Sequence, residues 1–289
     1  MRKNVLKLGI ILSTIALISC NDKKQQTAAE KESVPSELTD IDRGKAILQS
    51  LVSQDSTALD YISDSQYIQH NVYVPDGKQA FRDFRKSMMN TGVNIDIVRA
   101  FQDNDVVVIQ AVYDAGDKKT VGFDLFRFKD GKAVEHWDNA QALRETASGH
   151  TMYDGEAVVS DLDKTEANKT LVKAFVTDFL VNGDINAIDN YVNSEKYIQH
   201  NPDIKDGIVG LKTALAAMKE KGIKLTYNKI HHVFGQGNFV LVVSESNSMG
   251  KPLSIYDLFR VENGKISEHW DIIEEIPAKD KWANPHGKF

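Results

Sequence analysis

The chain has 289 residues, of which 42% are hydrophobic and 26% are charged, and its formal net charge is −6. This length suits two domains of roughly 120 residues each better than one small core. The composition excludes a disordered chain and a membrane protein with many spans. The acidic balance excludes a basic surface for nucleic acid, so we expect no DNA or RNA partner.

The N-terminus predicts a lipoprotein signal peptide over residues 1–19. A basic start at residues 2–7 precedes an apolar run at residues 8–19, which is too short to span a bilayer comfortably. The run leads into Leu-Ile-Ser-Cys at residues 17–20, which is similar to the bacterial lipobox, whose cysteine carries the lipid. Cys20 is the only cysteine, which favours acylation over a disulfide. A plain cleaved signal peptide with an incidental cysteine is the alternative.

Residues 20–37 are polar and predict a flexible tether between the lipid and the folded body. Loss of the three basic residues of the signal peptide would take the net charge from −6 to −9. We therefore expect an acidic protein of the cell envelope, anchored to a membrane through the lipid on Cys20, at the outer membrane or its periplasmic face.

The remainder of the chain contains an internal duplication. Three motifs return in the same order, the first at an offset of 130 residues and the other two at 133, so about three residues are inserted in between. We expect one domain over residues 38–155 and a second over residues 160–289, with the boundary within residues 148–163. The motif pairs are Tyr67–Asn71 with Tyr197–Asn201, Asp124–Arg127 with Asp257–Arg260, and Glu135–Asp138 with Glu268–Asp271.

Each repeat begins with a helical pattern, clearest over residues 168–182, where apolar residues recur at helical spacing. A second short helix is expected over residues 187–192. The Tyr-Ile-Gln-His-Asn motif follows as an extended segment, and after an Asp-Gly turn comes a third helix with Phe81 or Leu211 on its apolar face.

Only strands follow the third helix. Residues 101–112 and 230–245 alternate or run apolar, and each leads to a strand pair around Asp130-Gly131 or Asn263-Gly264. Helices first and an antiparallel meander second predict an α+β fold, with a curved antiparallel sheet wrapped around three helices.

The last hairpin allows two registers. A two-residue Asn-Gly turn would pair Asp257 with Trp270, and a three-residue loop would pair Asp257 with His269; in the first repeat the choice is between Trp137 and His136 for Asp124. We favour the three-residue loop.

The favoured register places Asp124, Phe126, Val134, His136 and Asp138 on one face. The other face then carries two ion pairs that can stay partly in water, Arg127 with Glu135 and Arg260 with Glu268. It also carries Trp137 and Trp270, as packing residues rather than ligand platforms.

At these motifs the sequence resembles the SnoaL-like polyketide cyclases of the NTF2-like superfamily, over nearly all of both repeats. The resemblance implies two tandem cone-shaped domains, each with a deep pocket. Family enzymes use no cofactor: a pocket acid or base moves a proton next to a carbonyl, and hydrogen-bond donors hold the enolate. No cofactor or metal is therefore expected.

Two pairs of aspartates carry over by position. Asp138 and Asp271 match the family's acid/base Asp after the Trp, whereas Asp124 and Asp257 fall where related ketosteroid isomerases keep a neutral carboxylic acid. The isomerase base, an Asp before a Pro, is replaced here by Asn201. In the first repeat the Pro after Asn71 is also missing, which indicates a modified site.

The candidate catalytic residues are thus one set in each repeat. An inner face of carboxylates and imidazoles among apolar groups shifts carboxylate pKa values upward and suits proton transfer. The sets are His70, Asn71, Asp124, His136 and Asp138 in the first repeat, and His200, Asn201, Asp257, His269 and Asp271 in the second.

Several alternatives remain open for these residues. The histidines can be structural, and Asp124 and Asp257 can form ion pairs with Arg127 and Arg260. Two histidines and one carboxylate could also hold a metal, although no metal-binding spacing supports this.

Two functions compete at this stage. One is a cofactor-independent isomerase, cyclase or lyase acting on a small carbonyl-containing or polyhydroxylated molecule. The other is a binding module that holds a small ligand in the same pockets. In either case the two domains could pack as a pseudo-dimer.

Overall fold

The computed structural model describes residues 38–289. The predicted signal peptide, the tether and Cys20 lie outside the described residues. Within the described part, no helix is both long and apolar enough to cross a membrane.

The first repeat starts with helix α1 (Asp40–Ser50), whose N-terminus is closed by a capping box between Thr39 and Asp42. The short second helix is a 3₁₀ helix, η1 (Thr57–Tyr61), and the third is α2 (Lys78–Met88). The remaining elements are five strands: β1 (Ile68–Gln69), β2 (Asn94–Asp103), β3 (Val106–Asp114), β4 (Lys119–Lys129) and β5 (Lys132–Ala142).

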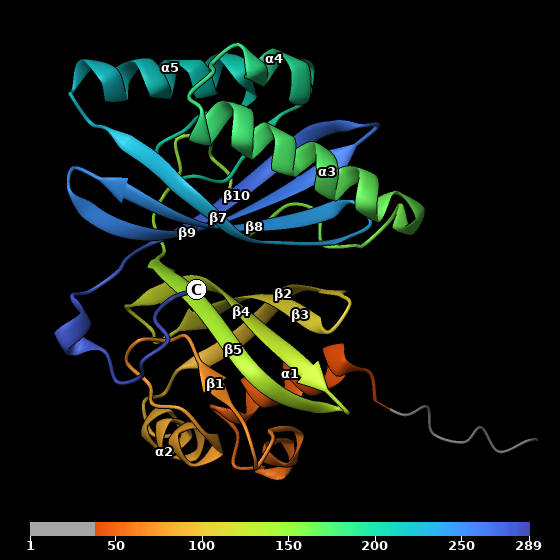
Figure 1. Cartoon of the computed structure of the whole chain (residues 1–289), viewed down its shortest axis with the longest axis vertical. Helices are drawn as coiled ribbons and strands as arrows, with labels where there is room; N and C mark the ends of the chain where they lie inside the picture. The colour runs from red at the N-terminus through yellow and green to blue at the C-terminus, as the bar shows by residue number, and fades with distance from the viewer. Residues whose placement is uncertain (1–37) are drawn as a thin grey trace, which may run out of the picture. The chain divides into compact units, whose positions relative to one another are not determined.

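The second repeat follows the same order after the segment 143–161. The 3₁₀ turn η2 (Leu162–Lys164) leads into α3 (Thr165–Phe175), which continues as a π-helical turn η3 (Val176–Val181). Figure 1 shows α3, α4 and α5 on one side of the sheet formed by β7 to β10. The other elements are α4 (Ala187–Tyr191), β6 (Ile198–Gln199), α5 (Gly207–Glu220), β7 (Leu225–Gln236), β8 (Phe239–Ser248), β9 (Lys251–Glu262), β10 (Lys265–Glu275) and the 3₁₀ turn η4 (Lys279–Lys281).

The two sheets have the same topology. Their strand orders are β1-β5-β4-β3-β2 and β6-β10-β9-β8-β7. The α+β prediction is confirmed, but the sheets are mixed rather than purely antiparallel, because the two-residue strands β1 and β6 pair parallel to β5 and β10. The apolar segments expected over 101–112 and 230–245 are each divided between two strands by a tight turn.

The register of the last hairpin differs from both sequence-based alternatives. Asn263 and Gly264 both have positive φ (52° and 72°) and form a two-residue turn, so Lys265 pairs with Glu262. A β-bulge between Ile266 and Glu268 then shifts the register by one residue. The preference for a three-residue loop was wrong, because a bulge several residues from the turn leaves no clear sequence signal.

The shift produced by the bulge still gives the expected faces. Asp257 lies opposite Asp271, and in the first repeat Asp124 lies opposite Asp138. Directly opposed residues share a face, so each aspartate pair points to the same side of its sheet.

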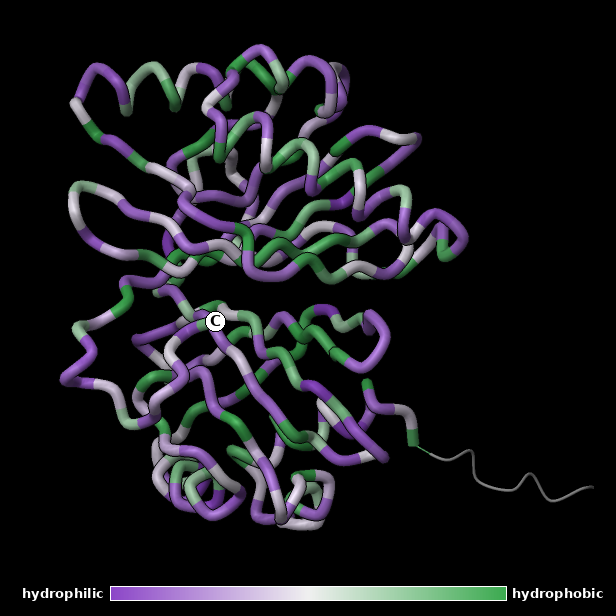
Figure 2. The backbone as a smooth tube through the Cα atoms, in the orientation of Figure 1, coloured by the Kyte–Doolittle hydropathy of each residue, from purple (hydrophilic) through white to green (hydrophobic). Residues whose placement is uncertain are grey.

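Each sheet buries its two faces in different surroundings. One face packs against the helices of its own repeat, as Phe126 does in the first and Phe259 in the second. The opposite faces contribute to a third cluster that contains residues of both repeats, including Trp137 and Trp270. Figure 2 shows the corresponding hydrophobic segments along the strands.

Candidate functional site

The helix-facing side of the second sheet carries a buried group of polar side chains. Asp257, His269 and Asp271 are 1%, 8% and 6% exposed. Nε2 of His269 lies 3.0 Å from Oδ1 of Asp257, and Nδ1 lies 3.0 Å from Oε1 of Gln199. Asn201 donates from Nδ2 to Oδ2 of Asp271 at 2.6 Å. Four of the five residues predicted for this repeat therefore meet at one place.

The hydrogen bonds of Gln199 fix the tautomer of His269. Oε1 of Gln199 accepts the backbone N–H groups of His200 (3.0 Å) and Asn201 (2.9 Å), which identifies this atom as the oxygen of the amide. Nδ1 of His269 must therefore carry a proton and donate it to this oxygen. Nε2 is left to exchange a proton with the carboxylate of Asp257.

Asp271 is the least satisfied member of the group. Its Oδ2 accepts from Asn201, but its buried Oδ1 has no hydrogen-bond partner within the described part of the chain. Burial and the nearby carboxylate of Asp257 raise the pKa of Asp271 above its ordinary value, although the charge of His269 partly offsets this. Such a carboxyl group can take up and release a proton nearer to neutral pH.

His269 is shifted in the same direction. Burial alone would lower the pKa of this imidazole, but the hydrogen bond with Asp257 and the charges of Asp271 and Asp257 outweigh it, so the pKa of His269 is raised. A positive imidazolium between two carboxyl groups is thus favoured at moderately acidic pH.

The first repeat builds the same arrangement from equivalent residues. His136 lies 3.3 Å from Oδ1 of Asp124 and 2.8 Å from Oε1 of Gln69. Asn71 donates to Oδ2 of Asp138 at 2.6 Å. The predicted set again comes together without its first histidine.

One contact has no equivalent in the second repeat. Nζ of Lys288, from the C-terminal segment, lies 3.3 Å from Oδ1 of Asp138 and 3.1 Å from Oε2 of Glu274. Burial alone would raise the pKa of Asp138, but Lys288, His136 and the hydrogen bond from Asn71 outweigh it and hold the pKa below its ordinary value. The two aspartates after the tryptophans are therefore shifted in opposite directions.

We call Asp124 and Asp257 the inner aspartates, and Asp138 and Asp271 the outer aspartates. A tyrosine hydroxyl contacts the inner aspartate in both repeats, but from different strands. Tyr113 on β3 donates to Oδ2 of Asp124, whereas Tyr227 on β7 donates to Oδ2 of Asp257 at 3.2 Å. Tyr113 pairs across the sheet with Ile95 and Tyr227 with Ser246, so the tyrosine has changed places with its cross-strand neighbour.

Burial and the adjacent carboxylate raise the pKa of Tyr113 and Tyr227 well above the ordinary value, so both remain donors. Motif matching missed them because they occupy non-equivalent sequence positions. It also missed the glutamine role, although Gln69 and Gln199 lie inside the repeated motif.

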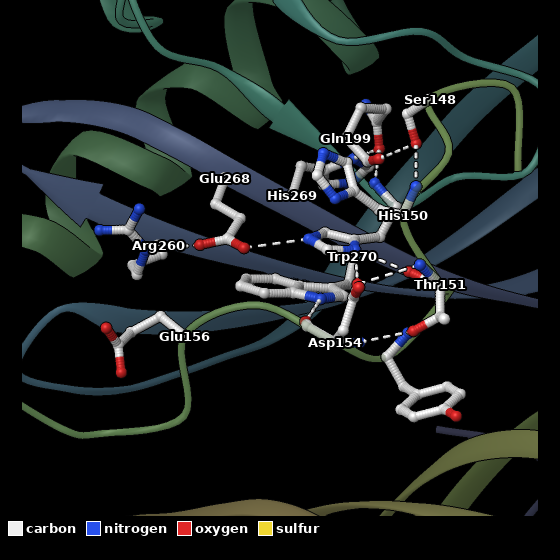
Figure 3. A network of polar contacts seen from close by, with 12 residues as sticks. Ser148, His150, Thr151, Asp154, Glu156, Gln199, Arg260, Glu268, His269 and Trp270 are labelled. Atoms are coloured by element: carbon white, nitrogen blue, oxygen red, sulfur yellow. Dashed lines mark hydrogen bonds and ion pairs between the residues drawn. The ribbon is translucent and has the colours of Figure 1, made fainter.

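His70 and His200 lie on the opposite side of the sheet, which corrects the expectation that they face the pocket. Nε2 of His200 lies 3.0 Å from Oε1 of Glu268, and its ring stacks on Trp270 at 4.7 Å. Figure 3 shows Glu268 between Arg260 and the ring that stacks on Trp270, while His269 lies apart from this ion-pair group. His70 repeats the arrangement with Glu135, at 3.0 Å. The extended backbone turns successive side chains to opposite faces, so the glutamine faces the pocket and the histidine does not.

The predicted ion pairs between arginine and glutamate form on this opposite face, Arg127 with Glu135 (2.8 Å) and Arg260 with Glu268 (2.7 Å). The second pair is not partly in water as expected, because the side chain of Glu268 is only 1% exposed. These arginines are thus engaged away from the inner aspartates, which leaves the histidines as the ionic partners of Asp124 and Asp257.

A cavity of about 320 Å³ opens onto the group in the first repeat. Apolar side chains from the helices and from the sheet line it together with the polar group. Its lining includes Leu48, Phe81, Phe84, Met88, Phe123 and Phe126 together with Gln69, Asn71, Tyr113, Asp124, His136 and Asp138. Its size suits a small molecule with an apolar body and a few polar groups.

Ligand atoms of Asp257, His269 and Asp271, and of their counterparts in the first repeat, lie within 4.8 Å of one another. Both nitrogens of His269 are already hydrogen-bonded, one of them to a fixed amide oxygen. The two-histidine set is not assembled, because His70 and His200 lie across the sheet. In the structure these residues form a hydrogen-bonded network.

No curated protein matches the chain. Among solved structures, an LEH-like epoxide hydrolase from M. tuberculosis is similar at 22% identity, over 38% of this chain and 85% of that one, with a TM-score of 0.31. A putative polyketide cyclase from Bacillus cereus has 14% identity, over 36% and 75%, with a TM-score of 0.32. An NTF2-like protein of unknown function from Cytophaga hutchinsonii has 18% identity, over 42% and 95%, with a TM-score of 0.29.

A family match covers both repeats. The family described as SnoaL-like domain matches residues 45–136 and again residues 172–269, together more than half of the chain. The chain therefore belongs to the SnoaL-like domain family and carries two tandem NTF2-like α+β domains.

Proposed function

We propose that the second repeat catalyses a cofactor-independent proton transfer on a small carbonyl-containing or polyhydroxylated molecule, as an isomerase, cyclase or lyase. The observation that carries the proposal is the buried, unpartnered Oδ1 of Asp271, next to the His269–Asp257 pair. An unsatisfied buried carboxylate oxygen destabilises the fold, so its retention favours a functional role.

In the proposed step, Asp271 removes a proton from the carbon next to a carbonyl. The C–H bond breaks, an O–H bond forms on Asp271, and the electron pair moves onto the carbonyl oxygen as an enolate. The positive charge of protonated His269, close to Asp271, stabilises the developing negative charge. Return of the proton to another atom completes an isomerisation, and attack of the enolate on a second carbonyl would give a cyclisation.

Asp271 is only 6% exposed, so we infer that a substrate reaches it through movement of a helix, and α5 suits this better than α2. In the first repeat Arg85 is buried and donates to the carbonyl of Ser50 (2.7 Å) and that of Ser53 (2.6 Å), which holds α2 in place. The equivalent residue in α5 is Leu215, which is half-buried and offers no such bond.

Deuterium exchange tests the proposal without knowledge of the natural substrate. The full soluble domain pair is incubated in D₂O with a panel of small ketones and hydroxyketones, and exchange next to the carbonyl is followed by NMR. We expect catalysed exchange of at least one compound, reduced about 100-fold or more in Asp271→Asn. A metal chelator should leave the rate unchanged. Exchange that persists in Asp271→Asn would contradict the proposal.

The second candidate is small-ligand binding, and the cavity of the first repeat favours it there. Asp138 is held by Lys288, while the cavity beside it is lined mainly by apolar side chains. Mass spectrometry of molecules that copurify with the protein tests this candidate. If a ligand copurifies equally with wild type and Asp271→Asn, and no panel compound exchanges, binding is the better account.

We also propose that the protein is exported and lipidated on Cys20, and that the two repeats pack as a pseudo-dimer. The lipobox-like segment at residues 17–20 supports the first point. The hydrophobic cluster with residues of both repeats supports the second. Labelling of bacteria with an alkyne fatty acid should mark the wild-type protein but not Cys20→Ser, and a label on both would contradict lipidation.

A further inference from the structure

Each repeat ends in a short segment that contacts the other repeat. We call residues 147–153 the linker arm and residues 283–289 the C-terminal arm. The backbone N–H of Ala147 donates to the carbonyl of Pro202 (2.9 Å), and that of Ala283 donates to the carbonyl of Val72 (2.7 Å). Val72 and Pro202 are equivalent positions of the two repeats, so the arms are exchanged reciprocally.

Two further contacts repeat in the same order. Nε2 of His150 lies 3.1 Å from Oδ2 of Asp206, and Nε2 of His286 lies 2.9 Å from Oδ2 of Asp76. These histidines are 136 residues apart, as are the two alanines that begin the arms. The duplication therefore extends into the arms, beyond the motifs that first revealed it.

The next position makes a backbone contact in both arms. Thr151 O lies 2.7 Å from Nδ1 of His200, and Gly287 O lies 3.0 Å from Nδ1 of His70. This contact explains what His70 and His200 do on the face away from the pocket, where each holds the arm of the other repeat. It also fixes the register of the arms, so that the following residues, Met152 and Lys288, are equivalent.

These two equivalent residues differ in charge. Both are buried, with Met152 1% and Lys288 2% exposed. Lys288 donates to the backbone carbonyl of Asp138 (2.8 Å) and lies 3.3 Å from its Oδ1. Met152 carries no charge, and Oδ1 of Asp271 has no partner within residues 38–289.

We propose that this arm position decides which repeat transfers protons: Lys288 fixes Asp138 as a permanent carboxylate, whereas the uncharged Met152 at the equivalent position leaves Asp271 free to act as acid and base. The inference rests on the proposed function and makes it specific to the second repeat. Lys288 and Met152 are positioning residues, since they act through the aspartates. The ion pair with Lys288 holds Asp138 at the edge of the first cavity and leaves that cavity to ligand binding.

The other charged groups near the two aspartates are largely matched. Each aspartate faces an inner aspartate, a histidine and an asparagine of its own repeat, and a buried tyrosine hydroxyl. The exceptions are Lys288, its partner Glu274 and the buried Tyr256 near Asp138, and Asp203 near Asp271. Asp203 has an arginine partner, Arg144, at 2.7 Å and is exposed, so its influence is weaker than that of the buried lysine.

The test measures protonation and exchange separately in the full domain pair. The pKa values of Asp138 and Asp271 are followed by ¹³C NMR of the side-chain carboxyls in Lys288→Met, Met152→Lys and the exposed control Lys281→Met. We expect Lys288→Met to raise the pKa of Asp138 and Met152→Lys to lower that of Asp271, with no change in the control. Lys288→Gln removes the charge but keeps a donor, and replaces Lys288→Met if that variant does not fold.

Exchange of the ketone panel in D₂O gives the second readout. In the Asp271→Asn background, Lys288→Met should restore exchange about tenfold or more over Asp271→Asn alone, because Asp138 then takes the role. An unchanged Asp138 pKa in a folded Lys288 variant overturns the inference, whatever the activity. Shifted pKa values without exchange in any protein, wild type included, contradict the proposed function but leave the control of protonation by the arms intact.

Discussion

The two repeats build one side-chain network in two electrostatic settings. Both place a histidine between an inner aspartate and a glutamine oxygen, and both bond the outer aspartate to an asparagine. In the first repeat the buried Lys288 contacts Oδ1 of the outer aspartate, Asp138. In the second repeat Oδ1 of the equivalent Asp271 has no hydrogen-bond partner within the described residues. The main electrostatic difference between the two sites thus comes from one residue of the C-terminal arm, Lys288.

The comparison also separates what is needed for the network from what can vary. The tyrosine donor to the inner aspartate is present in both repeats although it comes from β3 in one and β7 in the other. The hydroxyl donor is therefore common to both networks, whereas the strand that supplies it differs. The positive charge of Lys288 beside Asp138, by contrast, has no equivalent beside Asp271.

The largest expected effect concerns turnover. Asp271→Asn should reduce catalysed exchange by about 100-fold or more, since general acid–base catalysis contributes on that scale. Asp138→Asn removes the equivalent carboxyl of the first repeat and should cause a loss at least ten times smaller. Equal losses in the two variants would remove the functional difference between the repeats. Exchange rates in D₂O at saturating ketone give the measurement.

The same two variants should also differ in stability, and here Asp138→Asn should show the larger loss. Asp138→Asn removes one of the two carboxylates that contact the buried Lys288 and leaves Glu274 as its ionic partner, so we expect a loss of about 2 kcal/mol in the free energy of unfolding at pH 7. Because the pKa of Asp138 is lowered, this loss should shrink as the pH falls below 3.8 and through the lowered pKa. Urea unfolding across pH 2–7 measures it.

Asp271→Asn should show the reverse dependence on pH. The folded state holds the proton of Asp271 more tightly than the unfolded state, so the wild type loses stability as the pH rises from 3.8 through the raised pKa. The variant lacks this loss, and its stability relative to wild type should increase over that range. A decrease over the same range would show that Asp271 is stabilised as a carboxylate.

The tyrosine substitutions test the shared part of the network. Tyr113→Phe and Tyr227→Phe each remove one hydroxyl that donates to a buried carboxylate, and each should cost about 1.5 kcal/mol of unfolding free energy. Equal costs would support an equivalent bond from two strands. A cost in only one variant would show that the two hydroxyls do not contribute equally to stability.

The smallest effect is expected in the arms. His150→Ala and His286→Ala each remove a half-exposed ion pair with Asp206 or Asp76, which contributes no more than about 0.5 kcal/mol. Closely matched values in thermal unfolding would support the equivalence of the two arms. A cost above 2 kcal/mol in one variant alone would show that the arms are held differently.

The sequence predicted the fold well because its evidence was local and repeated. The helices, the hairpins and the inner face with Asp124, His136 and Asp138 follow from periodicity and motif spacing. The register did not, because its bulges near Val134 and Ser267 compensate for the shorter turn and keep the same faces. The face of the sheet on which each side chain lies was predictable from the alternating pattern, but its cross-strand partner was not.

The site was predicted less completely than the fold. His70 and His200 were assigned to the pocket because their motif also contains the real pocket residues, and one step along an extended segment reverses the face. Lys288 carries no motif, and its role depends on a contact with a residue 150 positions away. Contacts of this kind arise from the tertiary fold and leave no trace in local spacing.

The central claim is that the two outer aspartates are protonated differently in the same molecule. The most direct test is a pH titration of wild-type residues 38–289 by ¹³C NMR, with the Asp138 and Asp271 carboxyl signals assigned from the Asn variants. We predict a pKa below the ordinary aspartate value for Asp138 and above it for Asp271. Equal pKa values, or the reverse order, would contradict the account.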